Sequence, residues 1–465
     1  MPPVTINTDH FSLDVGGFAG FFGGDEAVSA METVHLYRAR RWTGWFNSPG
    51  SYSVGRHYGR LANSRFWDGM FPGAHIEPTT YIGLDGKSGP MYVASQSGTF
   101  LKQTGHLAYL LMQKCKDQRA VIVEGRKTRA NKVTILDMPD IKFDAGTENS
   151  LVIHARDGFH KHVALIPIAT SVATCILCAW GDDWYCFSLI LLGILVNGIS
   201  CFVIGSASIV LQSAASSKNA PPGDGMLMDG NHVIVVRGKE KNVLAITQGK
   251  FHLEYEPWVH AETNDEYAAI GFCSLLLVIQ FLTQLLLIPQ GKLFGQVMFL
   301  TSFAVSWAYN LFLSSMDGEY LQEEQLVQAL TLSEDRMKTY KLGTRTAAAV
   351  FACLTLQPDC EHKDWGNRGF KPQEILRQFI PNDTHVWTVW REQVLEQMRS
   401  SKQGGLQSLD LEACGNRIAA FNDVDKSLLG DLLSDARTAY QQYLVLQVRS
   451  RSLIGSVSSS VKTEA

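Results

Sequence analysis

Several sequence signals that would point to a known chemistry are missing from this chain of 465 residues. Of its nine cysteines, Cys115, Cys353, Cys360 and Cys414 are scattered without paired spacing, which favours a reducing compartment. The other five lie in or beside apolar stretches, and Cys175 and Cys178, although they have redox-motif spacing, are interpreted with them as apolar packing residues. The first 22 residues lack a basic stretch followed by an apolar run, so we expect no cleavable signal peptide. The chain also contains no nucleophile elbow, zinc-protease helix or dinucleotide-binding glycine pattern. These absences exclude the enzyme classes that such motifs define.

Two local patterns resemble binding motifs without completing them. Gly-Lys-Ser at residues 86–88 matches the end of a phosphate-binding loop, but Tyr81 occupies the required upstream glycine position, which predicts a simple turn. The densest imidazole group consists of His154, His160 and His162. Metal binding would need further ligands there, and histidines flanking an apolar helix are the simpler interpretation. We therefore expect no metal and no cofactor.

Charge is absent from the interiors of four long apolar stretches, residues 163–180, 184–211, 267–288 and 293–313. Each is long enough to cross a hydrocarbon core of ~30 Å as a helix that rises ~1.5 Å per residue. The pattern predicts an α-helical membrane protein with four transmembrane helices in two hairpins. Because no ionisable side chain lies inside the spans, a charged ion pore or a proton-coupled transporter is disfavoured.

The polar side chains inside these spans include four amides, Asn197, Gln280, Gln284 and Asn310. Gln280 and Gln284 lie one turn apart on the same helix face. Amides in a lipid-embedded helix should face the bundle interior and bond across helices, with contributions of ~0.6–2 kcal/mol each. We favour this structural role, and a pathway lined by the same amides is the alternative.

The basic residues near the spans predict the orientation. Arg156, Lys161, Lys218 and Lys250 lie on one side, while Lys292 is the basic residue in the two short turns of the other side. Both termini and the central insert are therefore predicted to be cytosolic. Trp180 and Trp184 bracket the first turn, as in an interfacial aromatic belt.

The remaining sequence divides into five regions. Residues 1–75 are rich in glycine, aromatics and arginine and are expected to be partly disordered. Residues 76–160 are expected to form a mixed α/β region, with a helix at 100–115 and strands at 120–123, 133–136 and 151–154. Residues 212–264 are expected to form a linker and a β-rich insert, with strands at 233–236, 243–246 and 251–255 in a meander. Because isolated hairpins are unstable, we expect the two sets of strands to join one sheet. Residues 318–448 are predicted to be helical, in helices at 319–332, 344–356, 383–398 and 424–448, and the Ser-rich tail 449–465 to be disordered.

The segment 33–67 combines arginines and aromatic residues and contains no acidic residue. Its arginines are Arg38, Arg40, Arg41, Arg56, Arg60 and Arg65. This composition suits anionic lipid headgroups at the cytosolic surface, and it also suits RNA, but a membrane tether favours lipid over nucleic acid. An equally good interpretation is that these side chains cover the folded domain.

Several segments of the chain are similar to those of one protein family. They are residues 269–273, 288–291, 304–307, 342–346 and 381–384, together with Trp387, Asp435, Ala436 and Tyr440. Over residues 160–445 the chain resembles a family of multi-pass membrane proteins from mushroom-forming fungi. That family has no assigned activity, so the resemblance implies architecture and a fungal source and carries over no functional residue.

The sequence therefore favours a non-enzymatic membrane protein that acts as a scaffold through contacts with lipids and other proteins. A transporter or membrane-embedded handler of a hydrophobic small molecule is the first alternative. The second is a membrane-tethered enzyme, because an active site need not match a known motif. Neither the organelle nor the oligomeric state follows from the sequence.

Overall fold

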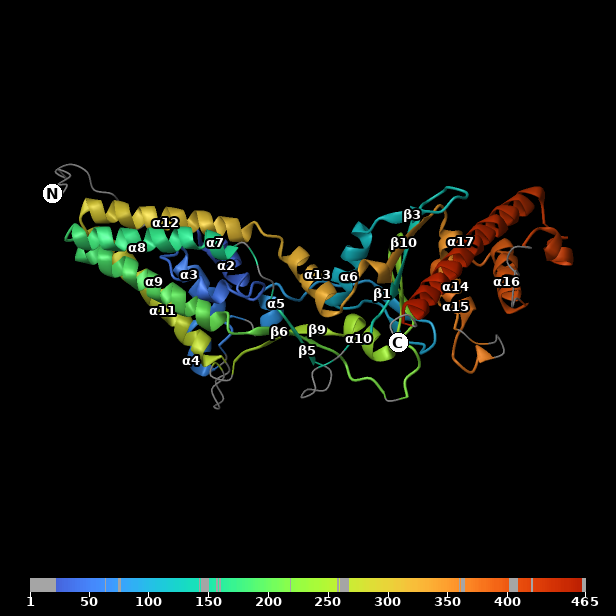
Figure 1. The fold of residues 1–465 in the computed structure, drawn as a ribbon, viewed down its shortest axis with the longest axis horizontal. Coiled ribbons are helices and arrows are strands. Elements are labelled where there is room, and N and C mark those ends of the chain that lie inside the picture. The colour runs from blue at the N-terminus through green and yellow to red at the C-terminus, as the bar shows by residue number, and fades with distance from the viewer. Residues whose placement is uncertain are drawn as a thin grey trace. The chain divides into compact units, whose positions relative to one another are not determined.

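The computed structural model describes residues 22–62, 64–73, 77–141, 143, 150–155, 158, 160–217, 219–256, 259, 267–358, 360, 364–400, 409–419 and 421–461. The chain folds into two compact units (Figure 1). Unit 1 comprises residues Met1–Gly86, Leu151–Leu211 and Phe251–Gln325, and unit 2 comprises Lys87–Ser150, Gln212–Lys250 and Leu326–Ala465. Each unit is thus assembled from three separate stretches of the chain.

Unit 1 contains the four predicted apolar helices, which are long and apolar enough to cross a membrane. They are α8 (Leu165–Trp180), α9 (Trp184–Ile204), α11 (Ala268–Leu287) and α12 (Leu293–Ser314). A short helix, α7 (His160–Val163), precedes α8, and a 3-10 turn, η2 (Ile288–Gln290), follows α11.

The second apolar stretch was predicted to be one helix over residues 184–211, and this prediction was wrong at its end. Helix α9 stops at Ile204 with Gly205 as its C-cap, and residues Ser208–Gln212 form strand β6. Strand β6 lies between β5 (Ser150–Ile153) and β9 (Lys250–Glu254) in a three-stranded sheet. Hydropathy alone extends the helix too far because a buried apolar strand is as hydrophobic as a membrane span.

The described part of the N-terminal region is helical, contrary to the expected partial disorder. It contains α2 (Gly24–Glu32), η1 (Arg40–Trp42), α3 (Ser51–Gly59), α4 (Arg65–Met70) and α5 (Pro78–Tyr81). Residues 1–21 lie outside the described residues, and so does that part of the prediction. The helices are short and glycine-rich, so their stability depends on packing against longer helices and not on their own helical propensity.

Helices α2 and α3 are part of the same bundle as the four apolar helices (Figure 1). Helix α8 packs against α9 and α12, and α9 packs against α11. Helix α3 packs against α11, α2 packs against α12, and α2 and α3 contact each other. The pair α2 and α3 therefore fills the side of the bundle between α11 and α12. The N-terminal region was predicted to be separate from the spans, and this placement corrects that division.

Unit 2 is built on a seven-stranded sheet with the strand order β2-β1-β7-β8-β4-β10-β3. Its strands are β1 (Met91–Ala94), β2 (Phe100–Leu101), β3 (Ala120–Ile122), β4 (Asn131–Asp137), β7 (Gly225–Asp229), β8 (His232–Arg237) and β10 (Met337–Leu342). Strands β4 and β8 are parallel, with Val133 opposite Val233. This pairing confirms the shared sheet for the predicted strands at 133–136 and 233–236. The predicted strands at 151–154 and 251–255 are not part of it, because β5 and β9 lie in the separate three-stranded sheet.

Three secondary-structure predictions in unit 2 need correction. Residues 243–246 belong to helix α10 (Glu240–Thr247), where Val243 and Ile246 are one helical turn apart and both buried, so there is no three-stranded meander. Strand β10 lies between β4 and β3, so residues 318–448 are not wholly helical. Helix α17 (Asp423–Val461) continues through residues 449–461, where the sequence predicted a disordered tail. Extending an existing helix is easier than nucleating one, which favours this continuation.

The other helices of unit 2 cover the sheet. They are α6 (His106–Asp117), α14 (Arg345–Thr355), α15 (Pro372–Phe379) and α16 (His385–Ser400), with 3-10 turns η3 (Glu334–Arg336) and η6 (Glu412–Ile418). The Ala-rich helix α14 packs on the sheet and against α17, and α6 lies on the other side of the sheet (Figure 1). One apolar core joins alternate residues of β4 and β8 to α14, α16 and α17.

Candidate functional site

An irregular segment between η1 and α3, residues 43–50, lies inside the helix bundle of unit 1. We call it the inserted segment. It has no helical or strand hydrogen bonding of its own, yet its residues from Phe46 to Gly50 are all buried. Buried backbone groups need hydrogen-bond partners, so the surrounding helices have to supply them.

Asn197 and Asn310 are two of the three predicted span amides that hold this segment. The Asn197 amide on α9 donates to the backbone carbonyl oxygens of Gly44, at 2.7 Å, and Phe46, at 3.2 Å. The Asn310 amide on α12 donates to the Ser48 hydroxyl at 3.0 Å. Both amides face the bundle interior, as predicted.

Asn47 is the centre of the network and is fully buried. Its backbone N–H donates to the Ser171 hydroxyl of α8 at 3.0 Å, and its side-chain amide donates to the Ser302 hydroxyl of α12 at 2.9 Å. Its side-chain carbonyl oxygen accepts a hydrogen bond from the Gln284 amide of α11 at 3.3 Å. Ser171 and Ser302 lie near the middle of their helices, so the inserted segment reaches the middle of the bundle.

Two glycines on α9 make room for the segment. A side-chain carbon at Gly193 would collide with the Asn47 carbonyl oxygen, and one at Gly198 would collide with the Trp45 ring. Sequence reasoning did not identify Asn47. The usable signal was this pair of glycines in an otherwise bulky apolar helix, since small residues in such helices mark a close approach of another backbone.

The fourth predicted amide, Gln280 on α11, behaves differently. It is fully buried and faces the interior, but within the described residues neither its amide nitrogen nor its carbonyl oxygen has a hydrogen-bond partner. A buried unpaired amide costs ~1–3 kcal/mol. Gln280 is therefore the one of the four predicted amides that forms no hydrogen bond with the inserted segment.

The six arginines proposed for lipid contact do not form one surface. Arg38, Arg56 and Arg65 are exposed. Arg60 is partly buried near the Tyr81 hydroxyl, at 3.4 Å, and Arg41 forms an ion pair with Glu256 at 2.9 Å. Arg40 is buried, with 2% of its surface exposed. The three exposed arginines can contact a lipid at the surface. Arg40 cannot, because it lies inside the bundle.

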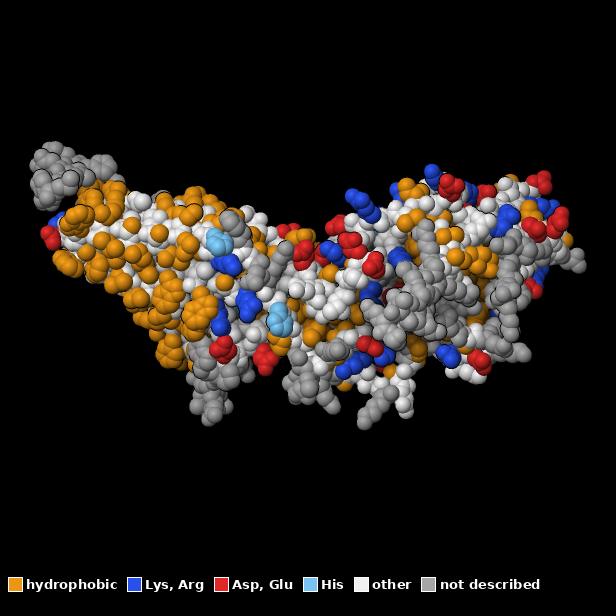
Figure 2. Space-filling view, in the orientation of Figure 1, with side chains coloured by type: hydrophobic (Ala, Val, Ile, Leu, Met, Phe, Trp, Pro, Cys, Tyr) orange, Lys and Arg blue, Asp and Glu red, His pale blue; other side chains and the backbone are white. Residues whose placement is uncertain are grey.

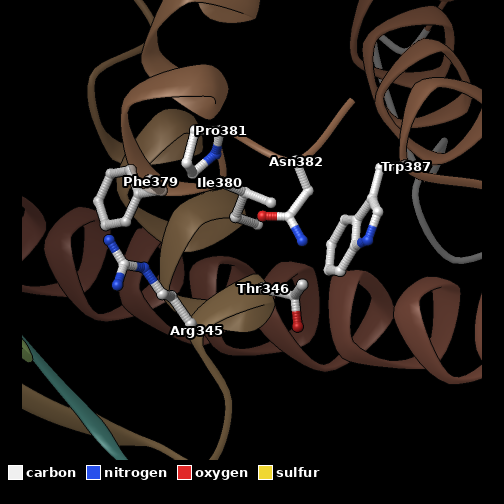
Figure 3. Close-up of a pocket in the computed structure, with 7 residues that line it drawn as sticks. All are labelled: Arg345, Thr346, Phe379, Ile380, Pro381, Asn382 and Trp387. Carbon is white, nitrogen blue, oxygen red and sulfur yellow. The ribbon is translucent and has the colours of Figure 1, made fainter. Parts of the chain in front are cut away.

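Unit 2 carries an open pocket of about 390 Å³ (Figure 3). Its walls come from the start of α14, the end of α15 and the loop into α16, and they are Arg345, Thr346, Phe379, Ile380, Pro381, Asn382 and Trp387. The Asn382 amide points toward the Trp387 ring across the opening, while Phe379 and Ile380 form an apolar wall (Figure 3). A pocket of this size and lining suits a small ligand or a side chain with one polar group.

A buried carboxylate stabilises the floor of this pocket. The Thr346 hydroxyl bonds to the Asp435 carboxylate of α17, which also accepts hydrogen bonds from Arg126 at 2.8 and 3.3 Å. The hydrogen bond with Asp435 raises the pKa of Arg126 above its ordinary value. The pocket thus brings together Arg345, Asn382 and Trp387, to which sequence reasoning gave no role.

Within the described ranges, no group of three or more His, Cys, Asp or Glu side chains is placed to hold a metal ion. Residues 160–163 form helix α7, so the segment with His160 and His162 is not a strand.

Comparison with known proteins gives no relative from which a function could be taken. The chain matches no protein-family model, no curated protein and no solved structure. Its functional proposals rest on its own residues.

Proposed function

We propose that the protein is a membrane-embedded scaffold, in which the bundle of unit 1 anchors unit 2 and unit 2 contacts a partner. The four apolar helices support insertion into a membrane. Hydrophobic side chains cover the face of this bundle that Figure 2 shows. Trp180, at the turn between α8 and α9, is 80% exposed, which suits an indole at a membrane interface.

The observation that carries the scaffold proposal is the use of the span amides. Asn197, Gln284 and Asn310 bond to the inserted segment, so they are occupied by protein and not directed into an aqueous path. Irregular backbone at membrane depth is stable only when protein or water satisfies it. The amides therefore serve to hold the N-terminal segment inside the bundle.

Thiol accessibility tests this assignment. In membranes carrying a Cys360→Ser background, Ser302→Cys should not react with a charged, water-soluble thiol reagent, because Ser302 is buried against Asn47. Asp182→Cys, in the exposed turn after α8, is the positive control and should react. Rapid labelling of Ser302→Cys in folded protein would mean that water reaches the bundle interior. That result would contradict the scaffold and favour a water-filled pathway.

The proposed orientation has two transmembrane hairpins, α8 with α9 and α11 with α12, and both termini and the insert in the cytosol. The lysines flanking the helices support it. Epitope tags at each end and in the 181–183 turn can be tested for protease access in sealed vesicles. The orientation is wrong if the turn tag and either terminal tag are cut from the same side.

The pocket of unit 2 is the proposed contact point for a partner. Arg345 is exposed beside an apolar wall, a combination that suits a carboxylate or phosphate attached to an apolar group. When the protein is purified intact in mild detergent, Arg345→Gln and Trp387→Ala should both abolish co-purification of the same partner. Arg368→Gln, an exposed arginine outside the pocket, should retain it. Retention in all three variants would exclude the pocket as the contact.

One observation favours the second candidate, a handler of a hydrophobic small molecule. The unpaired amide of Gln280 could bond a ligand that enters the bundle. Gln280→Leu distinguishes the two functions, because a scaffold without a ligand should become more stable when an unpaired buried amide is removed. A loss of a co-purifying small molecule in Gln280→Leu would instead support the handler.

A further inference from the structure

Arg40 is a buried cation without an anionic partner. Its Nη1 atom lies 3.4 Å from the Thr43 hydroxyl and 3.7 Å from the Cys201 sulfur. Its guanidinium lies 5.8 Å from the centre of the Tyr309 ring. Among the described residues no carboxylate pairs with it, and its Nε–H has no acceptor. The adjacent Arg41, by contrast, has Glu256.

This arrangement is costly unless something else compensates the charge. An arginine stays protonated in proteins, so it cannot become neutral on burial. Removing its charge from water costs several kcal/mol, which a weak thiol contact and one aromatic ring do not offset. Within the described residues this compensation is missing, and an anion that hydrogen-bonds to the Nε–H would supply it.

The position of Arg40 indicates where that anion comes from. Cys201 lies in the last turn of α9, and Tyr309 lies near the C-terminal end of α12. Both helix ends lie on the side of the bundle opposite the short turns 181–183 and 288–292. In a membrane-spanning bundle, which this step takes from the proposed function, this level is close to the lipid phosphates.

We propose that Arg40 binds a phosphate group inside unit 1, at the end of the bundle where α9 and α12 terminate. The phosphate can come from an anionic phospholipid headgroup or from free inorganic phosphate. Binding satisfies the Arg40 charge, and it makes the fold of the N-terminal segment depend on that anion.

Thermal unfolding of delipidated full-length protein in detergent tests the site. Phosphatidic acid or inorganic phosphate should raise the Tm of the unmodified chain by roughly 3 °C or more. A rise with phosphatidic acid alone identifies the lipid, and an equal rise with inorganic phosphate identifies the free ion. Arg40→Met should abolish the rise, while Arg56→Met, which removes an exposed arginine, should keep it. An equal response in Arg40→Met, or none in the unmodified chain, overturns the proposal.

The sign of the Arg40→Met effect gives a second, independent measure. If no anion binds, replacing an unpaired buried charge by an apolar side chain should be neutral or stabilising. If the phosphate binds, Arg40→Met should be less stable than the unmodified chain at saturating phosphatidic acid. Equal or greater stability of the variant under that condition refutes the site. Because this assay is performed in detergent, its result is separate from the thiol-labelling test of the scaffold.

Discussion

The side-chain amide of Asn197, in the middle of an apolar helix, donates to the backbone carbonyl oxygen of Gly44 at 2.7 Å. Two positions separated by 153 residues in the sequence are thus joined inside the bundle. The contact makes the N-terminal segment an internal part of unit 1. It also means that a polar residue in an apolar helix is satisfied by protein backbone, with no water or ion required.

Replacing Asn47 should destabilise the bundle. Asn47→Ala leaves the Ser302 hydroxyl and the Gln284 amide without their shared partner, so we expect a loss of about 2–3 kcal/mol. The measurement is the unfolding midpoint of the detergent-purified chain. Ser188→Ala is the matched control, because its exposed hydroxyl bonds only to its own helix and should matter little. Equal midpoints for the two variants would mean that the inserted segment is not held as described.

Adding one methyl group at Gly198 should have the opposite sign from adding it at Gly69. In Gly198→Ala the new carbon meets the Trp45 ring, and overpacking of this kind costs about 1–3 kcal/mol. In Gly69→Ala it meets open space on helix α4, so a gain of up to about 1 kcal/mol is expected. Both are measured by thermal unfolding. Two variants that shift the midpoint in the same direction would contradict the close approach at Gly198.

The two aspartates that contact Arg126 should differ in their importance. Asp435, with 2% of its side chain exposed, bonds to both Arg126 and Thr346, whereas Asp431 is 52% exposed. Asp435→Ala should cost about 3–5 kcal/mol and disturb the pocket of unit 2, and Asp431→Ala should cost less than about 1 kcal/mol. Denaturant unfolding monitored by tryptophan fluorescence reports both. Similar losses in the two variants would show that burial does not decide the effect.

His232 should make unit 2 less stable in mild acid. Burial, reinforced by Lys132 and Lys116, lowers the pKa of His232 to about 4. The unfolded chain has the ordinary histidine pKa near 6.5, so it takes up a proton first as the pH falls. The stability contribution is complete above about pH 6.5 and is lost between about 6.5 and 4, with about 2 kcal/mol lost by pH 5.

The variant His232→Gln tests this dependence, since it keeps a polar side chain near the Thr134 hydroxyl and does not titrate. Its unfolding free energy should fall less than that of the unmodified chain between pH 7 and 5. His154→Gln, at an exposed position, should leave the slope unchanged. Parallel pH profiles for the unmodified chain and His232→Gln would exclude His232 as the cause.

The sequence by itself determined the elements whose signal is local. Four uncharged apolar stretches predicted four long helices, and β-branched runs predicted strands such as β4 and β8. The inward direction of Asn197 and Asn310 also followed from local reasoning, because an amide in lipid is stable only when it is bonded. The helical C-terminal segments α14 and α16 were found from their apolar periodicity.

Tertiary structure alone decided what those elements contact. The segment around Asn47 has no helical or strand pattern, and its burial depends on hydrogen bonds from helices more than 120 residues away. Strand β6 was hidden within an apolar run, and β10 enters the sheet from a region of helical sequence. Local propensity predicts a helix or a strand, but long-range packing and the pairing of buried polar groups select the partner. For that reason the sequence predicted the apolar helices and the inward amides, while the inserted segment, the Arg40 site and the unit 2 pocket emerged only from the fold.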